Sequence, residues 1–231
     1  MNNMKAIFED DDLIVVDKPA GVTVNRSETT KSDTLQDWLD NRFVNPNDKS
    51  EFSQRSGIVH RLDKETSGIM VVAKNASSFE KLKNQFKERQ TKKTYIALAH
   101  GKLKTTEGEI NAPVGRLPWN RMRFGVLAGG REAVTKYRVI KNLEINGELM
   151  TLLEVEPKTG RTHQIRVHLK HIGHPIFADP LYSGRKVSIA DRVKLPRVFL
   201  HAKKLEFLHP TTGERMSFES ELPKELKDLI L

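Results

Sequence analysis

Five apolar residues in succession, IMVVA at positions 69 to 73, limit the fold of this chain more than any other feature. A run this short and this rich in β-branched residues is typical of a strand buried on both faces. Directly before it, the segment GIVHRLDKETSG carries His60, Arg61 and Asp63. Charged groups at the mouth of a core strand usually belong to a solvated loop, so this segment alone leaves both a structural and a functional interpretation open.

The rest of the chain is predicted to form strands, with fewer helices between them. Apolar runs on either side of the acidic residues 9–12 predict an N-terminal hairpin. A first helix is predicted over 34–43 with Ser32 or Asp33 as its N-cap, and a second begins at a capping box from Ser77 to Glu80. A mobile loop is expected over 44–56. Further strands are expected at 93–99, 109–112, 134–140, 150–155, 197–207 and 215–218, and further helices at 162–172 and 224–230.

Strands outnumber helices and hairpin spacings recur, which favours an α+β fold with a mixed, mostly antiparallel sheet. The length of 231 residues fits one domain over 1–231 built as two packed halves. The chain has no cysteine, no apolar leader and no apolar run long enough to span a membrane. We therefore expect a cytoplasmic protein, with a monomer as the default state.

Charged residues are distributed unevenly along the sequence. A formal net charge of +9 combines an acidic N-terminal turn with basic clusters, which lie at 81–104, 116–131 and 161–170. Basic clusters of this kind are either a solvated surface or the footprint of a polyanion such as nucleic acid.

A second arginine-rich segment gives Asp63 a candidate partner. On the helix expected over 162–172, His163, Arg166 and Lys170 share one basic face opposite the apolar residues. A carboxylate that works at neutral pH in a partly dry cleft needs a nearby cation to remain ionised, and an arginine fork does this best. We predict that Asp63 pairs with Arg166.

Other sequence features give weaker evidence of function. The histidines at 163, 168, 171 and 174 have no zinc-type spacing and no carboxylate among them, so helix-surface, RNA-facing or capping roles are expected and no metal site is predicted. Tyr95, beside Lys93, is either half-buried packing or a ring on which a base stacks. Phosphate-loop, dinucleotide and serine-hydrolase motifs are absent.

Taken together, these segments resemble the RluA-type family of RNA pseudouridine synthases over nearly the whole chain. The family's HRLDxxTSG signature stands at His60 to Gly68, its KxY element at Lys93 to Tyr95, and its GRxHQIRxH element at Gly160 to His168. The late LHA element is at Leu200 to Ala202, and DLIVVDKPAGV resembles the first hairpin of the family.

The resemblance implies a pseudouridine synthase fold with a central catalytic cleft and a reaction that isomerises uridine in RNA without cofactor or metal. It implies that Asp63 is the catalytic carboxylate, that Arg166 holds it ionised, and that Tyr95 stacks on the uracil. The target base would leave its stack to reach Asp63. The residues implied to bind the RNA substrate are Arg61, His60, Leu200, Arg161 and Lys93.

Two departures from the family pattern matter. The first hairpin begins near Lys5, so we expect no N-terminal S4-type RNA-binding domain and a substrate choice that rests on the catalytic domain. Ala178 stands where relatives usually have glycine. The RNA is expected to be large-subunit ribosomal RNA or transfer RNA, with no obligate protein partner.

Two other functions compete with this interpretation. A catalytically silent RNA-binding protein of the same fold would need the lysines but not Asp63, Tyr95 and Arg166 together. A metal-dependent nuclease would need a carboxylate and histidine constellation that the sequence does not supply.

Overall fold

The computed structural model describes residues 4–27, 32–43 and 47–231, which form two compact units. Unit 1 comprises residues 1–92 and 202–221, and unit 2 comprises 93–201 and 222–231. Seven strand pairs in the described part of the chain are antiparallel, so the predicted α+β class with a mostly antiparallel sheet is confirmed. Within these residues, no helix combines the length and apolar character needed to cross a lipid bilayer.

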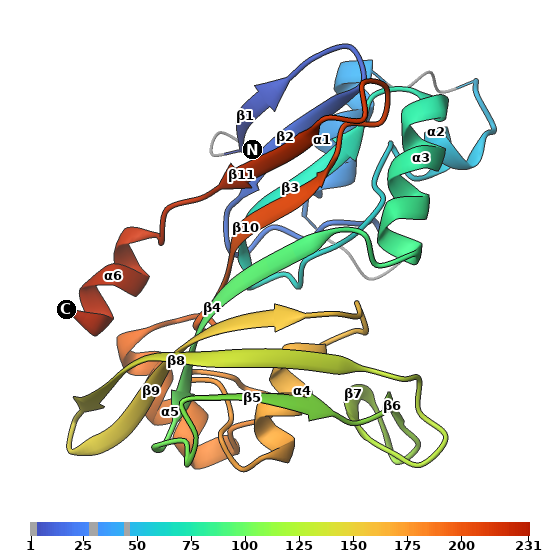
Figure 1. The fold of residues 1–231 in the computed structure, drawn as a ribbon. Coiled ribbons are helices and arrows are strands. Elements are labelled where there is room, and N and C mark those ends of the chain that lie inside the picture. Colours follow the sequence, from blue (N-terminus) through green and yellow to red (C-terminus); the bar gives the residue numbers. More distant parts are fainter. Residues whose placement is uncertain (1–3, 28–31, 44–46) are drawn as a thin grey trace. The chain divides into compact units, whose positions relative to one another are not determined.

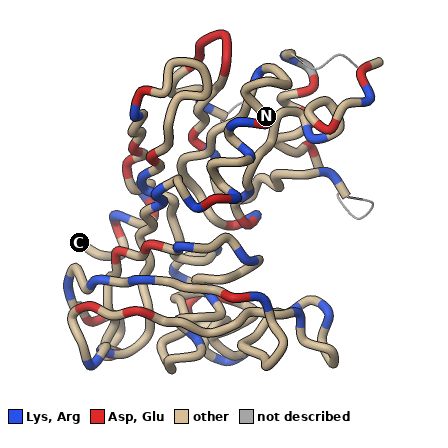
Figure 2. The backbone as a smooth tube through the Cα atoms, turned by 45° about the vertical axis from the view of Figure 1, so that its right-hand side comes forward, with Lys and Arg blue, Asp and Glu red and all other residues tan. Residues whose placement is uncertain are grey.

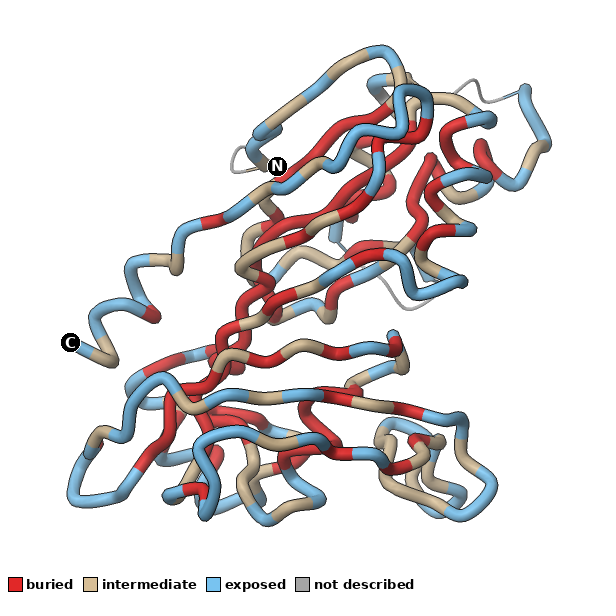
Figure 3. The backbone as a smooth tube through the Cα atoms, in the orientation of Figure 1, coloured by how far each residue is buried: buried red, intermediate tan, exposed pale blue. Residues whose placement is uncertain are grey.

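The sheet of unit 1 is built around two buried strands (Figure 1). Its order is β1, β2, β3, β10, with β11 paired to β10. Every residue of β3 is buried, as the IMVVA run predicts, and four apolar residues of β2 are fully buried beside it (Figure 3). The strands are β1 (Lys5–Glu9), β2 (Leu13–Lys18), β3 (Ser67–Ala73), β10 (Leu200–Leu208) and β11 (Arg215–Glu219).

Three helices complete unit 1: α1 (Leu35–Phe43), α2 (Glu51–Gln54) and α3 (Ala76–Lys87). On α3, Phe79 and Leu82 are fully buried against β2, β3 and β10, as their helical spacing predicts.

The predicted helix starts are wrong by one or two residues. Helix α3 is capped by Asn75, whose side chain accepts the Ser78 N–H, and not by a box from Ser77 to Glu80. At α1, Thr34 and Asp37 form a reciprocal capping box, so the cap is not at Ser32 or Asp33. The expected loop over 44–56 contains α2, because Phe52 is buried in the core and Ser50 caps the turn; residues 44–46 lie outside the described residues.

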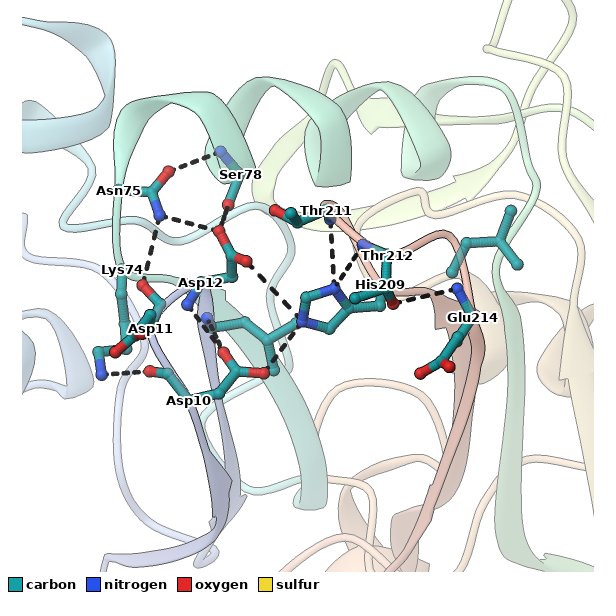
Figure 4. Close-up of polar contacts among 12 residues, drawn as sticks. Asp10, Asp11, Asp12, Lys74, Asn75, Ser78, His209, Thr211, Thr212 and Glu214 are labelled. Atoms are coloured by element: carbon teal, nitrogen blue, oxygen red, sulfur yellow. Dashed lines mark hydrogen bonds and ion pairs between the residues drawn. The ribbon is translucent and has the colours of Figure 1, made fainter.

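A polar cluster ties the β1–β2 turn of unit 1 to α3 and to the β10–β11 turn (Figure 4). It consists of Asp10, Asp12, Asn75, Ser78 and His209 and is called the turn cluster here. Asp12 accepts hydrogen bonds from Ser78 and Asn75, which together with Thr211 lower the pKa of its carboxyl from 3.8 to about 2. His209 accepts two backbone N–H groups at Nδ1 and donates from Nε2 to Asp10 over 3.0 Å. The N-terminal acidic residues therefore stabilise turns of the fold.

Unit 2 contains a sheet in the order β4, β9, β8, β5 and a separate two-stranded hairpin, β6–β7. The hairpin was not predicted, because its sequence lacks a clear apolar alternation. The strands are β4 (Lys92–His100), β5 (Glu107–Asn111), β6 (Val114–Leu117), β7 (Asn120–Val126), β8 (Val134–Ile145) and β9 (Glu148–Pro157).

The helices of unit 2 are α4 (Gln164–His171), α5 (Arg185–Lys194) and α6 (Lys224–Ile230). Residues 164–169 of α4 are all buried, so the helix is enclosed on every side along this stretch. Leu169 packs with Leu98, Leu153 and Phe199 in the core of this unit. The predicted ends of α4 and α6 agree with the structure to within two residues, whereas α5 was not predicted.

Candidate active site

The loop that carries Asp63 is fixed to unit 1 at both ends. On the N-terminal side, the Val71 N–H of β3 donates to His60 Nε2 over 3.1 Å, so this nitrogen carries no proton. The His60 ring also stacks on Phe86 of α3, with centroids 4.4 Å apart. His60 therefore connects the loop to a strand and a helix; its predicted contact with RNA stays a prediction.

On the other side of Asp63, the loop is held by a buried lysine. Lys18 is fully buried at the end of β2, and its Nζ donates to the carbonyls of Pro19, Val22 and Lys64 over 3.0, 2.9 and 3.2 Å. The Lys64 carbonyl accepts the Gly21 N–H as well, over 2.8 Å. The KPAG turn thus fixes the residue next to Asp63, a role that is not apparent from the sequence.

Close backbone packing explains the glycine that ends the signature. Gly68 has φ +117°, and a Cβ there would lie 2.2 Å from the carbonyl oxygen of Ala202 on β10. No side chain fits at this position. Within this fixed frame, Asp63 is half-buried and Arg61 is exposed, so both side chains are accessible to solvent while their backbone is constrained.

In unit 2, Arg166 forms a buried two-point pair with Asp179. Arg166 Nε and Nη2 donate to Asp179 Oδ2 and Oδ1 over 2.8 and 2.9 Å, with the arginine only 6% exposed and the aspartate fully buried. The pair uses two of the five guanidinium N–H donors. Arg166, which the spacing places on a basic face with His163 and Lys170, is therefore buried inside the unit.

The turn around Asp179 is itself held by several contacts. Asp179 Oδ1 accepts the N–H groups of Leu181 and Tyr182, and the Ala178 N–H donates to Asp191 of α5 over 2.9 Å. Ala178 adopts φ +59°, a left-handed conformation that glycine would adopt with less strain. Asp179 was missed because a single aspartate before a proline is an ordinary turn signal.

The other candidate residues of unit 2 differ in exposure. Tyr95 and Lys93 lie two residues apart on β4, hence on the same face, and both are half-buried. Leu200 is buried at the start of β10. Arg161 precedes α4, where its Nε donates to the Glu132 carbonyl over 2.9 Å.

One histidine of the predicted set has a purely internal position. His168 is fully buried, with its ring nitrogens 2.9 Å from Thr135 Oγ1 and from the Ala112 carbonyl. Burial lowers its pKa and so favours the neutral ring. The surface, capping or RNA-facing role expected from the sequence is wrong for His168. In the described part of the chain, no group of three or more histidine and acidic side chains is arranged to hold a metal ion.

The candidate residues thus divide between the units. His60, Arg61 and Asp63 belong to unit 1, and the other five belong to unit 2. Within its own unit, Arg166 pairs with Asp179; the predicted pair with Asp63 stays a prediction.

Known proteins resemble the chain over almost its whole length. A family model described as RNA pseudouridylate synthase matches residues 12–171. A protein of Nitrosomonas europaea named ribosomal large subunit pseudouridine synthase D is 43% identical over 98% of this chain, which spans only 64% of that protein's length. An Aquifex aeolicus protein named uncharacterized RNA pseudouridine synthase is 44% identical over 96% of this chain and 71% of its own. The solved structure of human RNA pseudouridylate synthase domain containing 1 aligns with a TM-score of 0.74 and 27% identity, covering 96% of this chain and 84% of that one.

Proposed function

Because this chain belongs to the RNA pseudouridylate synthase family, we propose that it isomerises uridine to pseudouridine in RNA. In this reaction the bond between C1′ and N1 of the uridine breaks and a bond between C1′ and C5 forms. The proton on C5 leaves and N1 gains one, so the product has the same atoms and oxidation state as the substrate. Such chemistry requires a group that stabilises or attacks C1′ and a group that helps remove the C5 proton.

Asp63 is proposed as the group that acts at C1′, either by attack or by assisting loss of the base. The observation that carries the proposal is the anchoring of its loop. Hydrogen bonds at His60 and Lys64 fix the backbone on both sides, while the Asp63 side chain stays half-exposed. A catalytic group needs this combination, because it must be held in place and still reach its substrate.

Arg166 is proposed to orient Asp63 and to hold it ionised in the RNA-bound enzyme. Its pair with Asp179 takes up one edge of the guanidinium, formed by Nε and one hydrogen of Nη2. Nη1 and the second Nη2 hydrogen form the other edge, which has the geometry to serve a second carboxylate. Asp179 fixes the rotamer of Arg166, which supports the proposed contact.

The remaining residues are proposed to hold the flipped nucleotide. Tyr95 would stack on the uracil and help remove the C5 proton, and Leu200 would pack near the same base. Arg61 would contact the surroundings of the flipped nucleotide, with His60 holding its loop. Lys93 and Arg161 would bind phosphates. Large-subunit ribosomal RNA is the first substrate to test, because the Nitrosomonas europaea relative carries that substrate in its name.

The test uses unmodified transcripts of large-subunit ribosomal RNA and of transfer RNA. Each is incubated with the protein in EDTA, and pseudouridine is mapped by carbodiimide adduct formation and primer extension. The wild type should form pseudouridine, and Asp63→Asn should lose at least about a hundredfold in rate while RNA binding persists. Asp11→Asn, an exposed carboxylate of the same unit, is the matched control and should retain wild-type activity.

Other outcomes would identify the competing functions. Undiminished product formation by Asp63→Asn would remove the role given to that residue. RNA binding without product from the wild type would favour a silent RNA-binding protein, and strict metal dependence would favour nuclease chemistry. Arg166→Ala should also lower the rate severely, and wild-type turnover by that variant would contradict the role of Arg166.

A further inference from the structure

The β6–β7 hairpin has a tip that no other part of unit 2 covers. Trp119 and Met122 are each 76% exposed, which is unusual for such large apolar side chains. Residues 113–131 contain four arginines and no acidic residue. Figure 2 colours the basic and acidic positions along the whole backbone. Among the described residues, no acidic side chain pairs with Arg121 or Arg123. The tip therefore combines an aromatic ring with guanidinium groups that lack acidic partners, which suits an unstacked base and its phosphates.

The strand β7 of this hairpin is bonded to the turn that holds Arg166. The Phe124 N–H donates to the Tyr182 hydroxyl over 3.0 Å, and the same hydroxyl lies 2.8 Å from His163 Nδ1. Tyr182 is 7% exposed, and the guanidinium of Arg166 lies 5.0 Å from the centre of its ring. The Tyr182 backbone N–H also donates to Asp179 over 3.2 Å. One residue therefore contacts the hairpin, the N-cap of α4, and both members of the buried ion pair.

His163 strengthens this connection. It stands directly before α4 in the left-handed conformation, with φ +57°, and has no side-chain capping bond. Its ring is instead set edge-on against Phe124 and Tyr182, with centroids 5.6 and 5.7 Å away. A residue in this strained conformation persists only where its surroundings hold it. A shift of β7 would therefore be transmitted to the start of the helix that carries Arg166.

We propose that the β6–β7 hairpin contacts the RNA and that Tyr182 is a positioning residue, which couples this contact to the orientation of Arg166. The inference rests on the proposed function and adds a coupling between RNA binding and chemistry. RNA held at Trp119 would draw β7 into its bound position, and the Tyr182 hydroxyl would then order the guanidinium. An RNA that fails to engage the tip would bind but react slowly.

The coupling is tested by a double-mutant cycle on the unmodified ribosomal transcript. The tip variant is Trp119→Ala with Arg121→Ala, and the link variant is Tyr182→Phe, which removes one hydroxyl and keeps the ring beside Arg166. The tip variant should raise KM about tenfold and also lower kcat. The link variant should lower kcat roughly tenfold with little change in KM, because it leaves the Phe124 N–H and His163 without their shared partner.

The combination distinguishes coupling from two independent defects. If Tyr182 transmits the signal, the tip substitutions lower kcat no further in the Tyr182→Phe background and raise only KM. If the two reductions in kcat multiply, the coupling is refuted. Tyr137→Phe is the matched control: it removes a hydroxyl bonded to Thr105 over 2.9 Å elsewhere in unit 2, and its kcat should equal that of the wild type.

Two measurements do not depend on catalysis. In a Trp38→Phe variant, Trp119 is the only tryptophan, and its emission should change when the transcript binds. Unchanged emission at saturating RNA would refute the contact at the tip. Amide exchange at Phe124 should be faster in Tyr182→Phe than in the wild type, and equal rates would refute the structural link. If the wild type forms no pseudouridine, the proposed function itself is refuted.

Discussion

Each unit of this protein buries a long cationic side chain in its part of the candidate site, Lys18 in unit 1 and Arg166 in unit 2, and the two have different hydrogen-bond acceptors. In unit 1, Lys18 donates to three neutral backbone carbonyls around the loop of Asp63. In unit 2, Arg166 is held by the carboxylate of Asp179. Lys18 thus fixes the path of a backbone, whereas Asp179 fixes the direction of a side chain. The difference teaches that a catalytic carboxylate on a loop and a catalytic cation on a helix need different kinds of support.

The largest effect is expected from breaking the ion pair of unit 2. Asp179→Ala leaves a buried guanidinium without its carboxylate and should lower the free energy of unfolding by about 3–5 kcal/mol. Urea unfolding followed by circular dichroism measures this change. Asp228→Ala removes an exposed pair with Lys224 and should change stability by less than about 1 kcal/mol. In Asp179→Ala, amide hydrogen exchange should become faster in α4 and stay unchanged in β2 and β3. Equally faster exchange in both units would contradict the inference that Lys18 and Arg166 are held independently.

A somewhat smaller loss of stability is expected from Lys18→Met. This change leaves three carbonyls without their charged donor and should cost about 2–3 kcal/mol, since hydrogen bonds to charged groups are the stronger ones. The change should also lower the rate of pseudouridine formation by loosening the segment next to Asp63. Lys74→Met, at a partly exposed lysine of the same unit, is the comparison and should cost less. A stable Lys18→Met protein with full activity would show that the KPAG turn does not need the ammonium.

The pH dependence of stability tests the turn cluster separately from Lys18 and Arg166. The hydrogen bonds from Ser78, Thr211 and Asn75 hold the Asp12 pKa near 2, below its ordinary 3.8. A depressed carboxyl pKa adds stability that is complete above about pH 4 and is lost as the pH falls toward 2. The loss attributable to Asp12 should be about 2 kcal/mol, at 1.36 kcal/mol per pKa unit.

Urea unfolding between pH 6 and 2.5 measures this loss, with Trp38 emission in a Trp119→Phe variant as the signal from unit 1. Asp12→Asn should flatten the pH dependence, whereas Asp11→Asn at the exposed neighbour should leave it as in the wild type. An undiminished slope in Asp12→Asn would assign the acid sensitivity to other carboxyls.

The smallest effects are expected at two residues that adopt the same left-handed conformation in different surroundings. Arg89 follows the C-cap of α3 at φ +59° with its side chain exposed, and Ala178 has φ +59° with its methyl fully buried. Arg89→Gly should raise the free energy of unfolding by up to about 1 kcal/mol, because glycine avoids the strain of this conformation. Ala178→Gly should raise the free energy of unfolding by less, since it also removes a buried methyl group. Thermal unfolding measures both, and Ala190→Gly inside α5 should have the opposite sign.

The sequence predicted the parts of the fold that depend on local patterns. The first hairpin, β3, the apolar face of α3 and the end of the chain follow from periodicity and turn residues, and the family motifs pointed to the candidate residues. What it missed depends on distant contacts. Asp179 is recognisable as a partner only when α4 and the following turn meet, and Lys18 only when the KPAG turn meets the Asp63 loop. The β6–β7 hairpin and α5 were missed because their apolar spacing is weak: Val114 is the single buried residue of the two hairpin strands, and seven of the ten residues of α5 are exposed.

The order in which strands of unit 1 appear along the chain has a consequence for biosynthesis. Its sheet needs β10 beside β3, yet most of unit 2 is made between these two strands. During translation β3 would therefore emerge with an open edge and wait for its neighbour. Pairing between segments so far apart is slow, and an uncovered apolar strand is prone to join the wrong partner. The IMVVA strand that anchors the mature protein is thus also the segment that most needs protection while the polypeptide is being made.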